Sequence, residues 1–229
     1  MIGIIGAMDI ETEDYKKAAE NMSVRRISGI DFVTGKICGK DVVFAEGGCG
    51  KVNAAICAEA MILAFSPEII INSGVAGGLD KRLSVADIAV ANSVVQYDID
   101  ITALGEEPGL ISKINKVHIN CDKRACELLA AEAAAIDGTT VVVGTIATGD
   151  TFLSDDNRKR YISSQFGAVA GEMESGAIGH VCFANNVKFG IIRAISDNAD
   201  GSAPKSYIAF KRTAADKTIR IVTEFIKKY

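Results

Sequence analysis

Runs of apolar residues alternate along the chain with segments in which small or apolar residues recur at helical spacing. The apolar runs predict buried β-strands, because a strand covered on both faces needs apolar side chains at successive positions. The predicted strands are residues 2–5, 68–72, 87–96, 139–148, 168–170 and 189–195. The predicted helices are residues 54–64, 122–135 with Asp122 as N-cap, 154–164, 175–184, and 205–228 with Ile208, Ala215, Ile219, Val222 and Ile226 at helical spacing.

Other segments carry weaker patterns. Residues 9–22 begin acidic, continue with mixed polarity and are interpreted as a helix. Residues 27–37 and 41–45 alternate apolar and polar positions, which predicts two strands joined by a turn at 38–40. We expect residues 98–102 to continue the strand 87–96 past a bend, and residues 104–120 to form mostly loop.

The order of these elements predicts an α/β protein. Strands that alternate with helices favour a mostly parallel sheet with helices on both faces. The 229 residues, 48% of them hydrophobic, are enough to bury one large core. Because no linker, internal repeat or low-complexity segment interrupts the sequence, residues 1–229 are predicted to form a single domain.

The charge balance narrows the possible partners. A net charge of −4 and a pI near 5.3 give no electrostatic reason to expect binding to nucleic acid. No apolar run is long enough to span a membrane, and the apolar N-terminus is interpreted as a strand because it lacks the basic residues of a signal peptide.

The 6 scattered cysteines are expected to be reduced and mostly buried, which favours a cytoplasmic protein. His118 and His180 lie far apart, which argues against a zinc site and against a Ser-His-Asp hydrolase.

Acidic residues cluster where two predicted strands end. The strand 168–170 leads to Glu172 and Glu174, and the strand 189–195 leads to Asp197. Ligands bind at the carboxyl ends of strands in open α/β sheets, so we expect a site here. Arg193 would balance the acids if the cluster is buried. The alternative is a solvated helix start, where acids are favoured by the helix dipole.

Two glycine-rich segments, 47–51 and 73–78, are expected to be turns between strands and helices. Neither follows a strong nucleotide-binding template, since 47–51 lacks the G-x-x-x-x-G-K-[ST] spacing and no G-x-G-x-x-G follows the first strand. They either form tight turns that need positive φ or bring backbone N–H groups close to a small ligand.

Six motifs in register give the chain a specific resemblance. Together they resemble the 5′-methylthioadenosine/S-adenosylhomocysteine nucleosidases of the purine and uridine phosphorylase superfamily. The motifs are residues 3–8 (GIIGAM) with Glu11, 50–55 (GKVNAA), 71–78 (INSGVAGG), 148–152 (TGDTF), 172–174 (EME) and 193–197 (RAISD). The resemblance implies a three-layer α/β/α sandwich with a mixed, partly barrel-like central sheet, which is less parallel than the element order suggests.

The resemblance also implies hydrolysis of an adenine N-ribosidic bond and gives roles to individual residues. Asp197 would protonate adenine N7, Phe152 would stack on the purine, and the backbone near Leu153 would read its edge. Glu174 would hold the ribose hydroxyls above Met173. The other residues implied at the substrate are Glu11, which would activate water, and Met8, Cys49, Val75, Ala76, Gly77, Glu172, Arg193 and Ser196.

The chemistry of the reaction agrees with these roles. Cleavage of the bond builds an oxocarbenium-like sugar and negative charge on the leaving base, so an acid at the base and carboxylates near the sugar stabilise both ends. An aspartate that donates a proton near neutral pH needs a raised pKa, which burial would supply. The acids and water suffice, so no metal or organic cofactor is expected.

Some positions depart from the family pattern. Val75 stands where family members carry serine, and Cys49 stands where an aliphatic residue is usual. In the family, the segment with Ile101 and Leu104 crosses a homodimer interface and lines the neighbouring subunit's pocket for the 5′ substituent. Glu106 would make that pocket more polar, or it points to solvent, which is usual for a charged loop residue.

We therefore predict a nucleosidase that acts on methylthioadenosine, S-adenosylhomocysteine and also 5′-deoxyadenosine. One alternative is a nucleoside phosphorylase of the same fold, but the turn at residues 6–9 lacks the arginine that would hold phosphate, and Asp9 and Glu11 would repel it. A nucleosidase for aminofutalosine is a second alternative. A non-catalytic nucleoside-binding module is a third, against which the set of acids counts.

Overall fold

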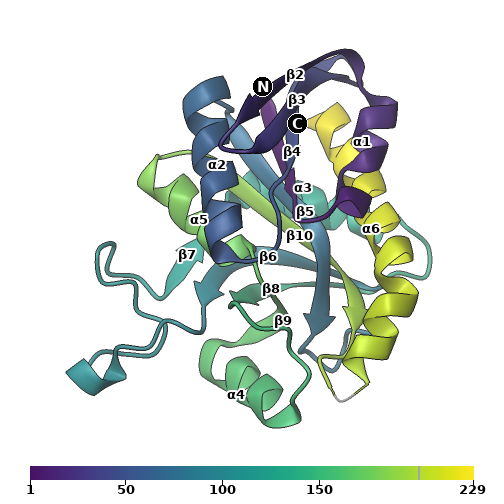
Figure 1. Cartoon of the computed structure of the whole chain (residues 1–229). Helices are drawn as coiled ribbons and strands as arrows, with labels where there is room; N and C mark the ends of the chain where they lie inside the picture. The colour runs from purple at the N-terminus through teal and green to yellow at the C-terminus, as the bar shows by residue number, and fades with distance from the viewer. Residues whose placement is uncertain (201) are drawn as a thin grey trace.

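A ten-stranded sheet forms the centre of the protein, with helices on both of its faces (Figure 1). The computed structural model describes residues 1–200 and 202–229. The strands are β1 (Ile2–Gly6), β2 (Glu20–Ile27), β3 (Ile30–Ile37), β4 (Lys40–Glu46), β5 (Ile69–Gly78), β6 (Ile88–Gln96), β7 (His118–Asn120), β8 (Val141–Thr148), β9 (Ala168–Glu172) and β10 (Lys188–Asp197). The helices are α1 (Glu13–Ala18), α2 (Lys51–Phe65), α3 (Lys123–Ala134), α4 (Asp156–Phe166), α5 (Ser175–Ala184) and α6 (Ala203–Lys228), with 3₁₀ turns η1 (Asp9–Glu11) and η2 (Thr102–Leu104).

Five of the strands close into a barrel. Their order is β10-β6-β8-β9-β5, and the ring closes because β10 also pairs with β5. From β5 the sheet continues outward through β1, β4, β3 and β2. Parallel pairs such as β1–β5 and β6–β8 stand beside antiparallel pairs such as β6–β10 and β5–β9. The mixed α/β architecture is therefore confirmed, whereas the mostly parallel sheet expected from the element order is wrong.

Two apolar layers cover the sheet, one on each face. Helices α2 and α5 lie together on one face, where Cys57, Met61 and Ile178 are fully buried. On the opposite face, α3 and α6 pack against each other and bury Leu129 and Phe225. Figure 1 shows α2 and α5 on one side of the strands and α1 and α6 on the other. This arrangement leaves the carboxyl ends of β1, β5, β8 and β10 free to form a site.

The structure corrects the expected turn at residues 73–78. These residues continue β5, which pairs with β10 as far as Gly77 and with β9 through Gly77 and Gly78. The small residues allow side chains from neighbouring segments to approach the backbone of this strand closely. A Cβ atom added to Gly74 would lie only 2.6 Å from Oε1 of Glu11. Glycine is therefore used here for space next to a carboxylate, and not for a turn.

The helix expected at residues 9–22 is confirmed only in its first part. Residues 9–11 form η1, α1 ends at Ala18, and β2 begins at Glu20 as the outer strand of the sheet. Seven of the eight residues of β2 are exposed, so this strand has no apolar face for the sequence pattern to reveal. Antiparallel pairing with β3 holds it in place instead.

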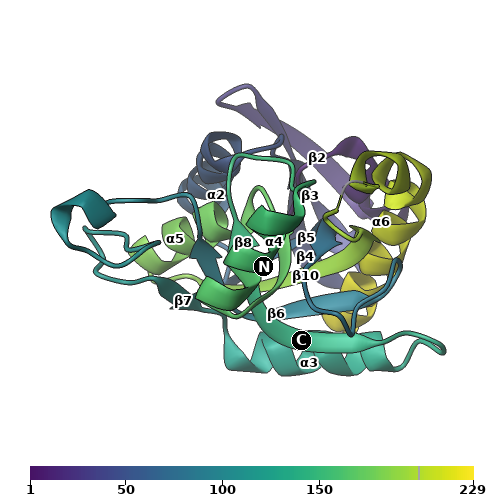
Figure 2. The ribbon, with the colours of Figure 1, turned by 90° about the horizontal axis from the view of Figure 1, so that it is seen from below.

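The segment between β6 and β7 projects from the body of the protein. Residues 98–102 turn into η2 and do not continue β6, so that expectation is wrong. Residues 104–120 form mostly loop as predicted, with one isolated bridge between Ile111 and Lys116 before β7. Figures 1 and 2 both show this projecting segment, residues 98–117, on the same side of the protein as α2 and α5.

Helix α6 follows the predicted pattern except in its first turns. Ala215, Ile219, Val222 and Ile226 are buried, but Ile208 is 73% exposed because the start of the helix turns Tyr207 inward instead. At α3, the side chain of Asp122 accepts a hydrogen bond from the N–H of Ala125 at 2.9 Å, which confirms the predicted N-cap. Within the described residues, none of the helices has the length and apolar character needed to cross a membrane.

The 6 cysteines are unpaired across the described chain. Cys57 and Cys182 are buried and Cys121 and Cys126 are half-buried, but Cys38 and Cys49 are exposed. The expectation that most of these thiols are buried therefore holds only in part. Cys49 lies in the pocket described below.

Candidate active site

A pocket of about 220 Å³ lies where the carboxyl ends of several strands meet. The segments that follow β1, β4, β8 and β9 contribute residues to it, as do the ends of β5 and β10 and the first turns of α6. The lining residues are Ala7, Met8, Glu11, Cys49, Val75, Ala76, Gly77, Thr151, Phe152, Leu153, Gly171, Glu172, Met173, Glu174, Ser196, Asp197 and Tyr207. The acidic cluster expected at two strand ends thus lies in a concave site.

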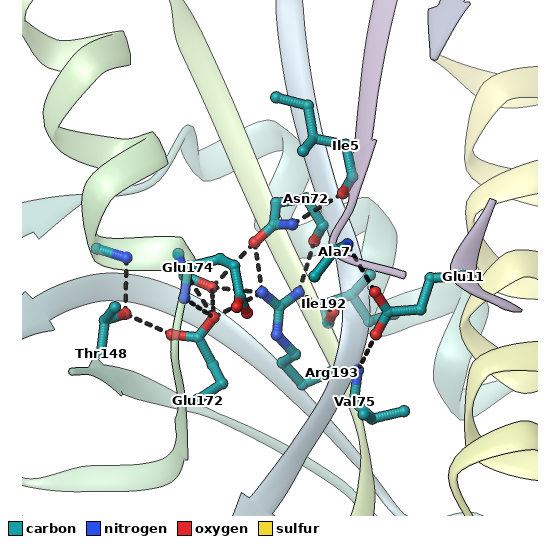
Figure 3. A network of polar contacts seen from close by, with 12 residues as sticks. Ile5, Ala7, Glu11, Asn72, Val75, Thr148, Glu172, Glu174, Ile192 and Arg193 are labelled. Carbon is teal, nitrogen blue, oxygen red and sulfur yellow. Dashed lines mark hydrogen bonds and ion pairs between the residues drawn. The ribbon is translucent and has the colours of Figure 1, made fainter. Parts of the chain in front are cut away.

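Glu11 comes from η1 and is held by backbone donors. Its Oε2 accepts a hydrogen bond from the N–H of Ala7 at 2.7 Å, and its Oε1 accepts one from the N–H of Val75 at 3.1 Å (Figure 3). The N–H of Met8 also donates to Oε2, at 3.0 Å. The side chain is 2% exposed. Burial raises the pKa of Glu11, although Arg193 and the backbone donors act in the opposite direction. A buried carboxylate with a raised pKa and fixed geometry is suited to act as a base.

Glu172 is the anchor of the site. Its Oε2 lies 2.7 Å from Nη2 of Arg193 and accepts hydrogen bonds from the N–H groups of Glu174 and Ser175 at 3.0 and 2.8 Å. Its other oxygen accepts a hydrogen bond from the hydroxyl of Thr148 (Figure 3). Burial acts to raise the pKa of Glu172, but the charge of Arg193 and the hydrogen bonds outweigh it and hold this pKa below its ordinary value. Glu172 is therefore an ionised group that fixes its neighbours.

Arg193, predicted to lie near the sugar, is buried behind the residues that line the pocket. Its side chain is 1% exposed and lies outside the set of lining residues. The guanidinium instead bonds Glu172, the hydroxyl of Ser175 at 2.9 Å, and Asn72 (Figure 3). Its Nε has no hydrogen-bond partner among the described residues. Arg193 was expected to balance the acids, and it does so from beneath the pocket floor.

Glu174 lies two residues beyond Glu172, in different surroundings. Its Oε1 accepts a hydrogen bond from the N–H of Gly50 at 2.9 Å, and the residue is 8% exposed. Burial, followed by the negative charge of Glu172, raises the pKa of Glu174 to about 8. This carboxyl group therefore faces the pocket short of hydrogen-bond donors. Hydroxyl groups or positive charge on a bound ligand would stabilise the ionised form of this carboxyl group.

Asp197 ends β10 at a second edge of the pocket. It accepts hydrogen bonds from the hydroxyl of Ser196 and the N–H of Ala199, both at 2.8 Å. Burial raises the pKa of Asp197 despite these donors. A carboxyl group that retains its proton at higher pH can donate it to a ligand.

Two aromatic side chains form one wall of the pocket. Phe152 is 42% exposed and meets Tyr207 edge to face, with ring centroids 5.5 Å apart. The hydroxyl of Tyr207 donates to Sδ of Met8 at 3.1 Å. Burial and the nearby carboxylates raise the pKa of Tyr207 to about 12, so the phenol stays neutral. A partly exposed ring next to an apolar wall can stack on a planar ligand.

The sequence missed four of the lining residues: Ala7, Thr151, Gly171 and Tyr207. Ala7 and Thr151 lie within recognised motifs, and Gly171 directly precedes one. Tyr207 lies in a helix whose apolar spacing predicted only that one face packs against the sheet. The sequence offered one indication of a second role, because this aromatic residue lies outside the regularly spaced apolar positions. Ile101 and Leu104 lie in the projecting segment and not in this pocket; Leu104 is 80% exposed, and Glu106 is also exposed in the single chain.

Within the described residues, no group of histidine, cysteine, aspartate and glutamate side chains is arranged to hold a metal ion. The pocket offers acids, small residues, sulfur atoms and aromatic rings. These groups suit an uncharged organic ligand with a planar ring and hydroxyl groups.

Comparison with known proteins gives consistent matches over the whole chain. Residues 1–227 match the family model described as the phosphorylase superfamily. The 5′-methylthioadenosine/S-adenosylhomocysteine nucleosidase of Haemophilus influenzae (strain PittEE) is 39% identical over 228 residues, which cover 99% of each chain. The crystal structure of the enzyme of that name from Neisseria meningitidis, in complex with methylthio-immucillin-A, has a TM-score of 0.96 at 33% identity and covers 100% of this chain and 99% of its own. The native structure of futalosine hydrolase of Helicobacter pylori has a TM-score of 0.94 at 31% identity, covering 100% and 97%.

Proposed function

The chain belongs to the phosphorylase superfamily and, within it, to the 5′-methylthioadenosine/S-adenosylhomocysteine nucleosidases, and on that premise we propose how its pocket works. The enzyme hydrolyses the N-ribosidic bond of methylthioadenosine and S-adenosylhomocysteine and releases adenine and a 5-substituted ribose. The observation that carries the proposal is that one pocket is lined by three acids from different elements: Asp197 at the end of β10, Glu11 on η1 and Glu174 directly before α5. Bond cleavage needs an acid at the base and carboxylates at the sugar.

Asp197 protonates adenine N7 and so makes the base a good leaving group. Its raised pKa supports this role, because a donor must still carry its proton when substrate binds. Ser196 holds one carboxylate oxygen and the Ala199 N–H holds the other, which fixes the direction of transfer. Phe152 stacks on the purine, and the backbone near Leu153 reads its edge.

Glu11 positions and deprotonates the attacking water. Three backbone N–H groups fix its carboxylate, so it offers one defined acceptor geometry to a water molecule. Glu174 accepts hydrogen bonds from the ribose hydroxyls, with Met173 beneath the sugar. The developing positive charge on the sugar favours ionised Glu174, which supplies stabilisation in the transition state that is weaker in the ground state.

The lining favours water over phosphate as the nucleophile. None of the lining residues in the described chain is a lysine or arginine, whereas Glu11, Glu172, Glu174 and Asp197 are all acids. Arg193 carries its charge below the floor and has Glu172 as its ion-pair partner. A phosphate ion would therefore enter an acidic pocket without a cation on its surface.

A substrate panel tests the assignment. Initial rates of adenine release are measured in phosphate-free buffer with methylthioadenosine, S-adenosylhomocysteine, 5′-deoxyadenosine and aminofutalosine. We expect turnover of the first two, and also of 5′-deoxyadenosine because its 5′ group is smaller. Turnover of aminofutalosine alone would instead place the enzyme with the second alternative, and binding without release would indicate a nucleoside-binding module.

We further propose that the enzyme is a cytoplasmic homodimer. Helix α2 exposes Val52 by 70% and Leu63 by 72%, and an apolar groove runs along it beside Val181 of α5. Only Lys51 and Glu59 of its fifteen residues are charged, and depletion of charge is typical of interface cores. A second copy on this face would bring Leu104 of the projecting segment toward the neighbouring subunit, since that segment lies on the same side (Figures 1 and 2).

A further inference from the structure

Lys51 joins three loops next to the pocket, although its own side chain does not line the pocket. Its Nζ lies 2.6 Å from Oδ1 of Asp98, and its backbone N–H donates to Oδ1 of Asp150 at 2.8 Å. The second oxygen of Asp98 accepts the N–H of Asp150 at 3.0 Å, which closes a ring of contacts. These residues follow β4, β6 and β8, so the ring ties together segments that are far apart in the sequence.

Two of the three loops carry a part of the site, and the loop of Asp98 ties them together. The turn before Lys51 holds Gly50, whose N–H donates to Oε1 of Glu174. The loop that starts at Asp150 continues directly to Phe152 and Leu153, the proposed contacts of the purine. A shift of this ring would therefore move the donor on the sugar side and the aromatic wall on the base side together.

The backbone at Gly50 makes this arrangement possible. Its φ of 92° and ψ of 160° lie in a region that only glycine occupies readily, and a Cβ added here would lie 3.1 Å from Oδ1 of Asp150. With this geometry two successive N–H groups point to two carboxylates, those of Glu174 and Asp150. Helix α2 then starts at Lys51.

The charge on Lys51 balances the carboxylate of Asp98. The side chains of Lys51 and Asp98 are only 19% and 21% exposed, so solvent screens their attraction weakly compared with a surface pair. In the part of the chain that the structure describes, no other ion pair involves Asp98 or Asp150. Without the lysine side chain, Asp98 would keep only the N–H of Asp150 as a partner, and its negative charge would have no balancing cation.

We propose that Lys51 is a positioning residue for the hydrolysis. Through Asp98 and Asp150 it holds the Gly50 N–H on Glu174 and holds the loop of Phe152 and Leu153 against the base. The inference rests on the proposed function of the same site, but Lys51 itself contacts neither substrate nor the reacting atoms.

A pH profile separates this role from a purely structural one. The Gly50 N–H stabilises the ionised form of Glu174 and so lowers its pKa; loss of that donor raises the pKa, and the acidic limb of kcat/KM moves to higher pH. The other groups that face Glu174 are Glu172, Arg193, Glu11, Cys49 and Tyr207. All except Cys49, which precedes Gly50, lie outside the segments that the ring holds.

The variants are Lys51→Met and Lys51→Arg, with Lys228→Met as the matched control. Lys228 also forms a partly buried ion pair, at 2.7 Å from Glu132, but lies at the end of α6. For Lys51→Met we expect a decrease of about tenfold in kcat/KM with methylthioadenosine, the shifted acidic limb, and faster amide hydrogen exchange in residues 49–51 and 149–153. Lys51→Arg should restore most of the rate, and Lys228→Met should lower the Tm without moving the pH profile.

The outcomes distinguish the inference from the function on which it rests. If wild-type enzyme releases adenine and Lys51→Met keeps its rate, pH profile and exchange rates, Lys51 has no positioning role and the function stands. The same conclusion follows if Lys228→Met shifts the acidic limb as much as Lys51→Met does. If wild-type enzyme releases no adenine while exchange at residues 49–51 and 149–153 still rises in Lys51→Met, the ring exists but the proposed function fails.

Discussion

Glu172 and Glu174 are separated by one residue and are both buried, yet their ionisation differs. Glu172 has Arg193, two N–H groups and two hydroxyl groups around it, which hold its pKa below the ordinary value. Glu174 has one N–H donor and the negative charge of Glu172 nearby, and its pKa rises to about 8. Glu172 therefore holds the surrounding side chains in place, whereas Glu174 has oxygen atoms free to accept hydrogen bonds from the substrate.

This contrast predicts a pH dependence of stability. Glu174 ionises near 4.5 in the unfolded chain and near 8 in the substrate-free folded protein. Between these values the folded state binds more protons, so the stability contributed by Glu174 is complete below 4.5 and is lost as the pH rises through about 8. The decrease in Tm between pH 5 and pH 8 should be smaller in Glu174→Gln than in wild type. The exposed Glu127→Gln, on α3, serves as control; equal decreases in all three proteins would show that the pKa of Glu174 is not raised.

The role of Asp197 predicts separate effects on binding and turnover. Asn at this position keeps the size of the side chain but cannot give a proton to adenine N7, so kcat should fall by about 10²- to 10⁴-fold. Calorimetry should show methylthioadenosine binding within a few fold of wild type, since the aromatic wall and Glu174 remain. Asp200→Asn, three residues further along, should leave kcat unchanged. A rate for Asp197→Asn close to that of wild type would remove Asp197 as the acid.

At the scale of elements, the sequence predicted most strands and helices because their burial is visible as apolar runs or helical spacing. It failed where an element has no such pattern: β2 is exposed on both faces, and the end of β5 is built from small residues that look like a turn. The six site motifs were found through the family resemblance; five of them include the last residue of a strand, and the sixth, residues 50–55, covers the start of α2. The ionisation of Glu172 and Glu174 was not predictable, since it depends on Arg193 and Gly50, which reach the pair from other parts of the fold.

The continuation of β5 predicts a specific effect of Gly74→Ala. The added Cβ would lie 2.6 Å from Oε1 of Glu11, so the carboxylate must move away from the water that it activates. We expect kcat to fall by about 10- to 100-fold. Gly35→Ala in β3 is the control, because its Cβ would lie 2.9 Å from the carbonyl oxygen of Glu20, far from the pocket in the sheet order. It should lower the Tm and spare kcat; if both variants keep full kcat, Glu11 does not depend on the space at Gly74.

At the scale of the whole molecule, the site needs both ends of the chain and, as proposed, a second copy. Glu11 follows the first strand, Asp197 ends the last, and Tyr207 comes from α6, so only the closed sheet brings them together. The projecting segment with Ile101 and Leu104 has no place in the pocket of its own chain. Its proposed partner is the pocket of the neighbouring subunit.

Mass measurement in solution tests the dimer. The chain has a mass of 24.1 kDa, and we expect light scattering to give twice that value for wild type. Leu63→Asp places a charge on the apolar face of α2 and should shift the mass toward that of one chain. Ile208→Asp is matched in exposure, 73% against 72%, but lies on α6 and should remain a dimer. Monomeric wild-type protein would contradict the proposed interface.

The most direct test of hydrolysis is the identity of the sugar product. Wild-type enzyme is incubated with methylthioadenosine in buffer that contains inorganic phosphate, and the products are separated and identified by mass spectrometry. The acidic lining predicts adenine and free 5-methylthioribose at equal amounts, at a rate that does not depend on phosphate. Formation of 5-methylthioribose 1-phosphate would contradict the account, because it would make phosphate and not water the nucleophile.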